Sequence, residues 1–505
     1  MTKLWLGLDV GTTSVKAAAY TPDGLQVANA DAPSLVTQSP GGKSEQDMAQ
    51  VWETVCAVLR DLNHQCEEQS FEAMGVAAQG DGIWCVTDDD LPAGPAMLWN
   101  DTRTAEDLAE LVTAGATKST GLGCHTSLWA GTSGMLWRWL RQNAPEQAAK
   151  TAHAFTCADW ICLCLTGEVA TDYSDASIPF LNFARRAYSD EQINDLECDD
   201  LAPKLVTPRR ADTELGKLTA EAALATGLPE GLPISVGTLD LSAMLVGMGM
   251  NKPGQTMMIM GTTAVVNILT DRVKPSDTPV GASVLHPTTD DVIIRVLAPT
   301  TGASAFDWFA ALHPKSLGGA SAGEVAMQLN SLVADVPPGS NGVTFLPYLN
   351  GERAPFVASD IRAAFHGLST TSTTGDMGRA VLEGAAFSLR HCFEEEGGLP
   401  TAPVKLTGGA AKNPVWCQII ADVVGQPVSV SEASDHGLWG AAVLGAAAAG
   451  LGDAVALASK RAETLRTYHP KQNKDYEPIF ARYATISRHH RALQAELLSM
   501  RKEAK

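Results

Sequence analysis

Three short glycine-containing turns carry the residues of this sequence whose types could hold phosphate groups. Each turn follows an apolar run that is typical of a strand. Such turns offer free backbone N–H groups, and threonine and serine add hydroxyl donors, so the three together could hold a polyphosphate without a Walker motif. Taken singly, each is more simply a hairpin or the start of a helix. The turns are Gly11, Thr12, Thr13 and Ser14; Gly261, Thr262 and Thr263; and Gly408, Gly409 and Ala410.

Two aspartates stand beside predicted strands, where an unpaired charge is costly. Asp9 ends the first apolar run, and it either binds Mg²⁺ or caps backbone N–H groups of the first turn. Asp240 follows a buried strand in "ISVGTLDLSAML" and begins a helix of small residues. It is either a helix N-cap or a base that faces a substrate hydroxyl.

The first two turns share one pattern, an apolar run, Gly-Thr-Thr and a second apolar run. "GLDVGTTSVKAAAY" spans residues 7–20, and "MMIMGTTAVVNIL" spans residues 257–269. Each predicts two strands joined by the turn, and their recurrence predicts a chain of two similar halves. Pro and Gly in "NKPGQT" indicate the boundary, so we expect domains over residues 1–250 and 251–505.

Strand-like runs alternate with helical runs in the first half, which predicts an α/β fold. We expect a helix over about Met48 to Leu62 and an amphipathic helix in "SGMLWRWLRQNAPE" that ends before Pro145. In the second half, the third turn leads into a helix with Asn413 as N-cap and Pro414 as its first residue. The charged residues past Lys460 predict helices on the outside.

Three further features favour structural explanations. "GGKS", residues 41–44, lacks the glycine that a P-loop needs five positions before the Gly-Lys pair, because Thr37 stands there. The cysteines of "CADWICLCLTG" lie in an apolar setting that predicts a buried helix rather than a metal site. Residues 440–458, "GAAVLGAAAAGLGDAVALA", are broken by glycine and aspartate, which predicts a buried helix pair rather than a membrane span.

The amino-acid composition and net charge restrict the classes of molecule that this protein is expected to bind. The 505 residues are 45% hydrophobic and 19% charged, as in a globular protein with room for two domains. A formal net charge of -20 disfavours nucleic acid and anionic membranes, both of which bind through Lys and Arg. The ten cysteines show no repeated spacing, and the first residues lead almost directly into a strand. We therefore expect a cytoplasmic protein without a disulfide framework.

Together these residues resemble the FGGY family of carbohydrate kinases over about residues 4–450. The most specific stretch is "AAFHGLSTTSTTGDMGRAVLE", residues 363–383, which looks like the family's C-terminal signature. "DVGTTSVKAAAY", "SPGGKSEQDM", "LWNDTRT", "VGTLDLSA", "GTTAVV" and "LTGGAAKNPVW" resemble other family segments in family order. One departure is that "LWAGTSGMLWRWL" offers Ser133 and Gly134 where the N-terminal signature usually carries a Lys.

The resemblance implies an α/β fold of two ribonuclease-H/actin-like domains with an interdomain cleft. Residues 1–250 would be the sugar-binding domain and residues 251–505 the nucleotide-binding domain with terminal helices. ATP and Mg²⁺ are the implied cofactors. By matching position, Asp240 looks like the catalytic base and a substrate contact, and Asp9 like the Mg²⁺-linked carboxylate. The cofactor-binding residues would be Gly11, Thr12, Thr13, Ser14, Gly261, Thr262 and Thr263, with Gly408, Gly409, Ala410 and Asn413 on the adenosine side.

For the sugar, the resemblance implies contacts after the strand that ends in "AAQGDG" and in the "WND" stretch. Polyol recognition needs fixed donors and acceptors and an apolar wall. "AQGDGIW" departs from the Met-His-Gly of typical D-xylulose kinases and the Gln-Arg-Glu of glycerol kinases, and it looks closer to erythritol or L-xylulose kinases. Gly80 is expected to leave space for a polyol longer than glycerol. The candidates are Gln79, Gly80, Asp81, Trp99, Asn100, Asp101 and Arg103, the last as the one nearby cation.

We therefore expect an ATP-dependent kinase that phosphorylates a primary hydroxyl of a small polyol or ketose such as erythritol or L-xylulose. The expected partner is this small molecule, with neither nucleic acid nor membrane, and a homodimer stays open. A catalytically silent sugar-binding regulator on the same fold is the alternative, which the presence of both Asp9 and Asp240 disfavours. An actin-like filament subunit is a third hypothesis.

Overall fold

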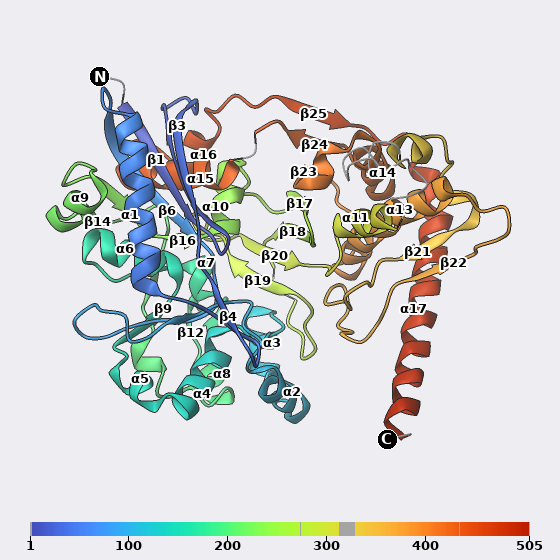
Figure 1. Ribbon diagram of the computed structural model, residues 1–505, viewed down its shortest axis with the longest axis horizontal. Helices are drawn as coiled ribbons and strands as arrows, with labels where there is room; N and C mark the ends of the chain where they lie inside the picture. Colours follow the sequence, from blue (N-terminus) through green and yellow to red (C-terminus); the bar gives the residue numbers. More distant parts are fainter. Residues whose placement is uncertain (1–2, 273, 313–328, 434, 504–505) are drawn as a thin grey trace. The chain divides into compact units, whose positions relative to one another are not determined.

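The computed structural model describes residues 3–272, 274–312, 329–433 and 435–503 (Figure 1). The chain forms two compact units. The first comprises Met1–Pro253, Thr270–Ile294 and Asp435–Ala462, and the second comprises Gly254–Leu269, Arg295–Ser434 and Glu463–Lys505. Two segments from beyond the expected boundary at residue 250 thus belong to the first unit.

A mixed sheet forms the centre of the first unit. Its order is β14-β15-β6-β1-β2-β3, with β16 also paired to β6. β1 is antiparallel to β2 and parallel to β6. The strands are β1 (Lys3–Val10), β2 (Ser14–Tyr20), β3 (Gln26–Pro33), β6 (Ser70–Ala78), β14 (Glu214–Lys217), β15 (Pro233–Ser235) and β16 (Thr238–Leu239).

Alternate residues of β1 face two different helical layers, as the twofold period of a strand requires. Leu4, Leu6 and Leu8 share one hydrophobic core with α1 (Met48–Gln65) and α6 (Cys157–Thr166). Trp5 shares another core with α15 (His436–Ala448) and α16 (Ala454–Ala458). α10 (Asp240–Gly247) packs against α15.

The small residues of α15 allow it to lie directly on the sheet. A Cβ atom on Gly75 of β6 would stand 1.9 Å from the Ala441 carbonyl oxygen, and one on Gly445 would stand 2.4 Å from the Met74 carbonyl carbon. Both distances are far below van der Waals contact. The glycines of "GAAVLGAAAAG" are therefore explained by a close helix-to-sheet approach.

The first unit has a further hydrophobic core, which includes Met135, Leu136, Trp137 and Phe180. The other helices of the unit are α2 (Ala105–Ala114), α3 (Lys118–Cys124), α4 (Ser133–Asn143), α5 (Pro145–Lys150), α7 (Tyr173–Ala176), α8 (Asp190–Asp195) and α9 (Ala220–Thr226), with the 3-10 turn η1 (Ala202–Lys204). Its short strands are β4 (Thr37–Ser39), β5 (Lys43–Gln46), β7 (Trp84–Val86), β8 (Ala96–Met97), β9 (His153–Phe155), β10 (Thr171–Asp172), β11 (Leu181–Asn182), β12 (Ala187–Tyr188), β13 (Pro208–Arg209) and β19 (Ala282–Leu285).

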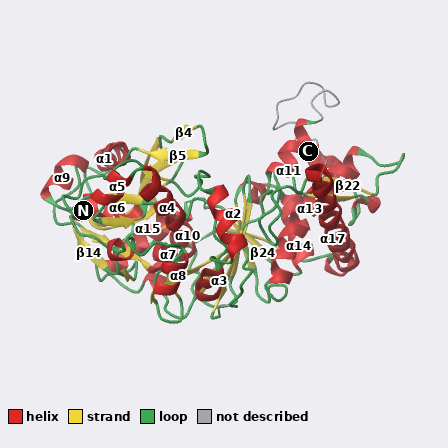
Figure 2. Ribbon diagram, turned by 90° about the horizontal axis from the view of Figure 1, so that it is seen from below, coloured by secondary structure: helices red, strands yellow, loops and turns green. Residues whose placement is uncertain are grey.

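The second unit contains strands in the order β20-β18-β17-β23-β24-β25. Helices α13, α14 and α17 pack against one another beside them, as Figure 2 shows in red. The strands are β17 (Thr256–Met260), β18 (Ala264–Thr270), β20 (Ile293–Leu297), β23 (Val404–Thr407), β24 (Val428–Ser431) and β25 (Leu465–Tyr468), with β21 (Thr344–Leu346) and β22 (Ala364–His366) as a separate pair. The helices are α11 (Ser304–Ala311), α13 (Thr374–Glu395), α14 (Pro414–Val424) and α17 (Asn473–Glu503), with the 3-10 turns η2 (Ser340–Gly342) and η3 (Gly409–Lys412).

The structure confirms the main local predictions. Both Gly-Thr-Thr segments are hairpins, with Val10 opposite Val15 and Met260 opposite Ala264. The cysteine-rich segment is the buried helix α6, and all ten cysteines are free. In "GGKS" the two glycines turn between β4 and β5, and Lys43 begins β5, so the segment does not lead into a helix. The apolar segment near residue 450 forms the helix pair α15 and α16.

Within the described part of the chain, no helix combines the length and the apolar composition that crossing a membrane requires.

Candidate active site

Three strands of the first unit end at the same edge of the sheet. Val10 of β1 and Leu239 of β16 are both register partners of Ala78 on β6, and both pairings are parallel. The first turn, residues 79–81 and Asp240 follow these three strand ends directly. The register therefore brings together segments that lie far apart in the sequence.

The carboxyl groups at this edge interact electrostatically. Burial raises the pKa of Asp9 to about 6, and the charge of Lys16 offsets part of this shift. Burial and then the charge of Asp9 raise the pKa of Asp240 to about 7. Burial and then the charge of Asp240 raise the pKa of Asp81 to about 7. Three half-buried carboxyls with interacting charges suit a site that binds a cation or moves a proton.

Asp240 is the first residue of α10, whereas the N-cap position belongs to Leu239. The N-cap interpretation of Asp240 is therefore wrong. Its Oδ1 accepts a hydrogen bond from the Leu241 N–H at 2.5 Å, which fixes the carboxyl group at the start of the helix. A fixed carboxylate with a pKa near neutrality has the properties of a general base.

Thr12 connects the first turn to two of the predicted sugar contacts. Its hydroxyl donates to Gln79 Oε1 at 2.7 Å and accepts from Trp99 Nε1 at 3.1 Å. The Gln79 amide in turn donates to Gln46 Oε1 at 2.7 Å. Gln79 is 4% exposed, whereas Trp99 is 40% exposed. Gln79 thus holds the turn and the Trp99 loop in place, and the Trp99 ring is open to a ligand.

The predicted contacts Asp101 and Arg103 bind each other. Arg103 Nη2 lies 2.6 Å from Asp101 Oδ2 and 2.6 Å from Glu45 Oε1, and its guanidinium stacks on Trp139 at 4.4 Å. Asp101 also accepts from the Ser44 N–H at 2.7 Å. Both charges are thus engaged in supporting the loop that carries Trp99 and Asn100. Arg103, expected as the one nearby cation, is paired with Asp101 and Glu45.

Gly80 permits a close approach of other side chains rather than leaving an empty space. A Cβ atom at this position would lie 2.1 Å from Leu239 Cδ1 and 3.0 Å from Asp175 Oδ1. The expectation of free space at Gly80 is therefore wrong, because Leu239 fills it. Asp81, the next residue, has a φ of 55°, a left-handed conformation that is uncommon outside glycine and often marks functional sites.

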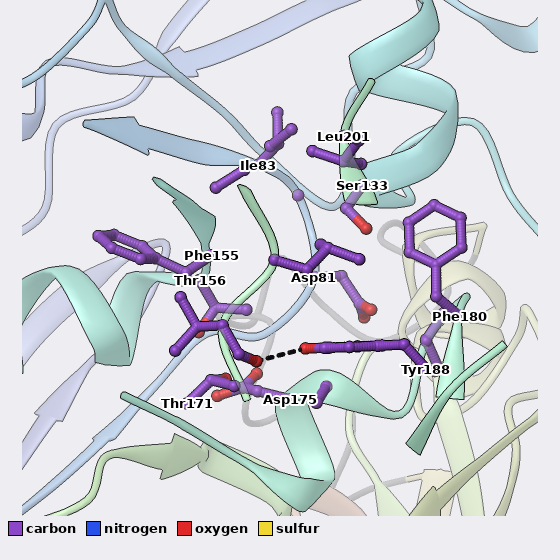
Figure 3. A pocket seen from close by; sticks show the side chains of 16 residues that line it. Asp81, Ile83, Ser133, Phe155, Thr156, Thr171, Asp175, Phe180, Tyr188 and Leu201 are labelled. Carbon is purple, nitrogen blue, oxygen red and sulfur yellow. Dashed lines mark hydrogen bonds between the residues drawn. The ribbon is translucent and has the colours of Figure 1, made fainter. Parts of the chain in front are cut away.

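A cavity of about 40 Å³ beside Asp81 contains residues that the sequence did not single out (Figure 3). Its walls combine polar side chains with apolar and aromatic ones. The Tyr188 hydroxyl donates to the Val206 carbonyl at 2.8 Å across part of this lining. The polar members besides Asp81 are Asp175, Ser133, Thr156, Thr171 and Tyr188.

Asp175 belongs to a group of three buried carboxyls with Asp159 and Asp172. Asp172 accepts from the hydroxyls of Ser174 and Thr238, each at 2.8 Å. Burial raises the pKa of all three carboxyls, most strongly that of Asp175, where the charges of Asp172 and Asp159 add to the shift. Two aspartates three residues apart in "TDYSDASIPF", without a neighbouring Lys or Arg, were the sequence signal for this group.

The other two glycine-containing turns meet in the second unit. β17 is parallel to β23, with Ile259 opposite Thr407, so the turns that follow these strands lie at one edge. The Gly302 N–H donates to the Thr262 carbonyl at 3.0 Å, which fastens the second turn to the start of α11. Gly408 has a φ of 93°, and a Cβ there would stand 2.6 Å from the Met260 carbonyl oxygen.

Asn413 caps α14 as predicted. Its Oδ1 accepts from the N–H groups of Val415 at 3.1 Å and Trp416 at 3.2 Å. Its amide also donates to Asn330 Oδ1 at 2.8 Å. The side chain is thus engaged at the start of the helix, and its contact with a nucleotide stays a prediction.

Two family models match most of the chain. The N-terminal domain of the FGGY family of carbohydrate kinases matches residues 4–247, and the C-terminal domain of the same family matches residues 256–449.

Curated relatives are similar over most of their length. The chain is 31% identical to an erythritol kinase of Brucella abortus (strain 2308) over 464 residues, which cover 88% of this chain and 87% of the relative. It is 27% identical to an L-xylulose/3-keto-L-gulonate kinase of Escherichia coli (strain K12), with 88% of each chain covered.

Solved structures share the fold. A structure described as a "xyloylose kinase" from Brucella ovis is 27% identical, with a TM-score of 0.87, and covers 97% of this chain and 100% of its own. A xylulose kinase from Lactobacillus acidophilus, at 21% identity and a TM-score of 0.88 with 98% and 100% covered, shows likeness of fold alone. The chain therefore belongs to the FGGY family of carbohydrate kinases, with the family's two-domain α/β fold of the actin-like class.

Proposed function

We propose that this carbohydrate kinase transfers the γ-phosphoryl group of ATP to a primary hydroxyl of a four- or five-carbon polyol or ketose such as erythritol or L-xylulose. The observation that carries the proposal is the meeting of Asp9, Asp81 and Asp240 at the ends of three strands, with interacting charges. The similarity to an erythritol kinase and to an L-xylulose/3-keto-L-gulonate kinase supports the substrate class.

Asp240 is the base in this proposal. Its carboxylate takes the proton of the substrate's primary hydroxyl, the hydroxyl oxygen bonds to the γ-phosphorus, and the bond from that phosphorus to the bridging oxygen breaks to release ADP. Phosphoryl transfer depends chiefly on positioning the reactants and on stabilising charge, so a single fixed carboxylate is sufficient as the general base. The Leu241 N–H holds that carboxylate.

Asp9 fits the role of a carboxylate linked to Mg²⁺. Among the described residues no hydrogen bond to the Asp9 side chain is found, so its oxygens are not committed to capping the turn. Mg²⁺ usually takes one or two carboxylates and fills its other positions with phosphate oxygens and water. A bound Mg²⁺ would supply positive charge against the phosphates.

The turns after β17 and β23 are proposed to hold the nucleotide. Residues 261–263 follow β17, and Gly408, Gly409 and Ala410 follow β23, at one sheet edge. Turns after parallel strands commonly present N–H groups to phosphates. Residues 11–14 of the first unit, next to Asp9, are the third proposed phosphate contact. No observation favours the silent regulator, and the cytoplasmic location stays a prediction.

A substrate panel tests this proposal. ADP release is measured with erythritol, L-xylulose, D-xylulose and glycerol as acceptors, each with ATP and Mg²⁺. We expect the highest kcat/KM with erythritol or L-xylulose and weak turnover of glycerol. Glycerol as the best acceptor contradicts the proposed substrate class, and turnover of no acceptor contradicts the proposed reaction.

A further inference from the structure

Asp175 carries a buried carboxyl group that the proposed chemistry at Asp240 does not use. The residue is 6% exposed. Neither carboxyl oxygen has a hydrogen-bond partner among the residues that the structure describes. The Thr156 hydroxyl lies beside Asp175 and donates to Asp159 Oδ2 at 3.1 Å. Buried polar groups are almost always satisfied by protein, water or ligand, so both oxygens call for a partner from outside the chain.

The cavity beside Asp175 has room for such a partner. Its volume of about 40 Å³ exceeds the roughly 10–15 Å³ that one water-sized group needs, so it fits about three such groups. Ile83, Phe155 and Phe180 form its apolar wall (Figure 3). An apolar wall with a few fixed polar groups is the arrangement that binds carbohydrate-like ligands.

The lining favours a ligand that brings hydroxyl donors. The Tyr188 hydroxyl hydrogen is already donated to the Val206 carbonyl, so the Tyr188 oxygen remains as an acceptor. Carboxyl oxygens of Asp81 and Asp175 also accept hydrogen bonds. A polyol chain supplies a donor and an acceptor at every carbon and C–H groups for the apolar wall.

The cavity adjoins the proposed acceptor site. Asp81 lines the cavity and also interacts electrostatically with Asp240, the proposed base. The Cβ position of Gly80 lies 3.0 Å from Asp175 Oδ1, so Asp175 lies directly against the segment predicted to contact the sugar. The charge of Asp81 also acts on Asp175, so Asp81 interacts with both Asp240 and Asp175.

We propose that this cavity receives the end of the substrate farthest from the reacting hydroxyl, and that Asp175 is a specificity-determining residue for the hydroxyl groups at that end. The inference rests on the proposed function and deepens it by assigning the preference for four or five carbons to a particular side chain. On this proposal, a three-carbon polyol bound at Asp240 and Asp81 ends before Asp175. One or two further CHOH groups match the volume of the cavity.

The test compares Asp175→Ala and Asp175→Asn with a matched control. Asparagine still offers a donor and an acceptor, whereas alanine offers neither. Asp159→Asn is the control, because Asp159 is a fully buried member of the same carboxyl group that does not line the cavity. For each protein, kcat/KM is measured for erythritol, L-xylulose and glycerol, together with the KM for ATP and the melting temperature.

We expect Asp175→Ala to lower kcat/KM for the better longer substrate by about tenfold to 100-fold relative to glycerol, with the KM for ATP unchanged. Asp175→Asn should restore most of this preference, and Asp159→Asn should keep it. An unchanged ratio in Asp175→Ala, or an equal loss in Asp159→Asn, overturns the inference while the proposed function stands. A wild-type protein that phosphorylates no polyol or ketose overturns both.

Discussion

Asp81 lies between two groups of buried carboxyls. Its charge interacts with Asp240 on one side, and it contributes to the raised pKa of Asp175 on the other. Its left-handed backbone conformation orients the side chain at a point where residues 79–82 turn away from β6. In the proposed binding mode, Asp81 accepts a hydrogen bond from the middle of a substrate that reaches from Asp240 towards Asp175.

Replacing Asp81 by alanine should lower kcat/KM for the polyol or ketose without a matching effect on ATP. Loss of one hydrogen bond to a buried carboxylate costs about 1–3 kcal/mol, which corresponds to roughly 5- to 150-fold in kcat/KM for the polyol or ketose. The KM for ATP should stay nearly unchanged. Asp81→Asn, which tolerates the left-handed conformation, should lose less. Equal effects on ATP and sugar in steady-state kinetics would argue against this role.

At the scale of single residues, the sequence predicted functional roles for aspartates that adjoin strand ends. It did not predict roles for aspartates that come together only in the folded protein. Asp9 and Asp240 could be selected because each adjoins an apolar run. The spacing of Asp172 and Asp175 was a signal for a buried carboxyl group, but the proximity of Asp175 to Asp81 and Asp159 is set only by the fold. Asp101 and Arg103 were predicted as ligand contacts because the sequence does not show that they form an ion pair with each other. That ion pair depends on the fold of their loop.

At the scale of elements, the site depends on how three strand ends and one helix are packed. The parallel pairing of β6 with β1 and β16 sets the edge where the carboxyls meet. α15 packs closely against this sheet because glycine residues stand where the helix and the strand meet. The hairpins were predictable because their strands are adjacent in sequence. The return of α15 to the first unit was not, because its small residues indicate close packing without indicating the partner.

Two glycines of α15 provide a matched pair of substitutions. Gly445→Ala places a Cβ 2.4 Å from the Met74 carbonyl carbon, whereas Gly437→Ala meets only Asp9 Oδ2 at 3.9 Å, an ordinary contact distance. We expect Gly445→Ala to destabilise the protein by about 1–3 kcal/mol through overpacking. Gly437→Ala should be neutral or stabilising by up to ~1 kcal/mol through helix propensity. Equal melting temperatures for the two variants would refute the close packing of α15.

At the scale of the whole molecule, each unit is assembled from separated stretches of the chain, and the first also encloses a group of buried acids. The repeated hairpins indicated a boundary near residue 250. The later points where the chain passes from one unit to the other could not be predicted, because no change in local composition marks them. The folded protein keeps several carboxyls whose pKa is raised by burial: Asp9, Asp81, Asp159, Asp172, Asp175 and Asp240.

These raised pKa values predict how stability depends on pH. A carboxyl whose folded pKa exceeds its unfolded value of about 4 binds its proton more tightly when folded. Its contribution to stability is fully present below pH 4 and is lost as the pH rises through about 6 to 7, the folded pKa values of Asp9, Asp81 and Asp240. Without ligands, the melting temperature should therefore fall between pH 5.5 and pH 8 on the order of several degrees.

Asp159→Asn should make this fall shallower, because it removes one buried group whose pKa is raised. Asp88→Asn changes one exposed charge in a surface turn and serves as the control. A steeper fall in Asp159→Asn, or an equal change in both variants, would show that the buried acids do not govern the pH dependence.

The turnover of Asp240→Asn tests the central claim most directly. The substitution keeps the size of the side chain and an oxygen that accepts from the Leu241 N–H, while it removes the proton acceptor. With the best acceptor from the substrate panel at saturation, we predict a kcat lower by about 100-fold or more, a circular dichroism spectrum like that of the wild type and an unchanged KM for ATP. A folded Asp240→Asn variant with near-normal kcat would contradict the assignment of Asp240 as the base.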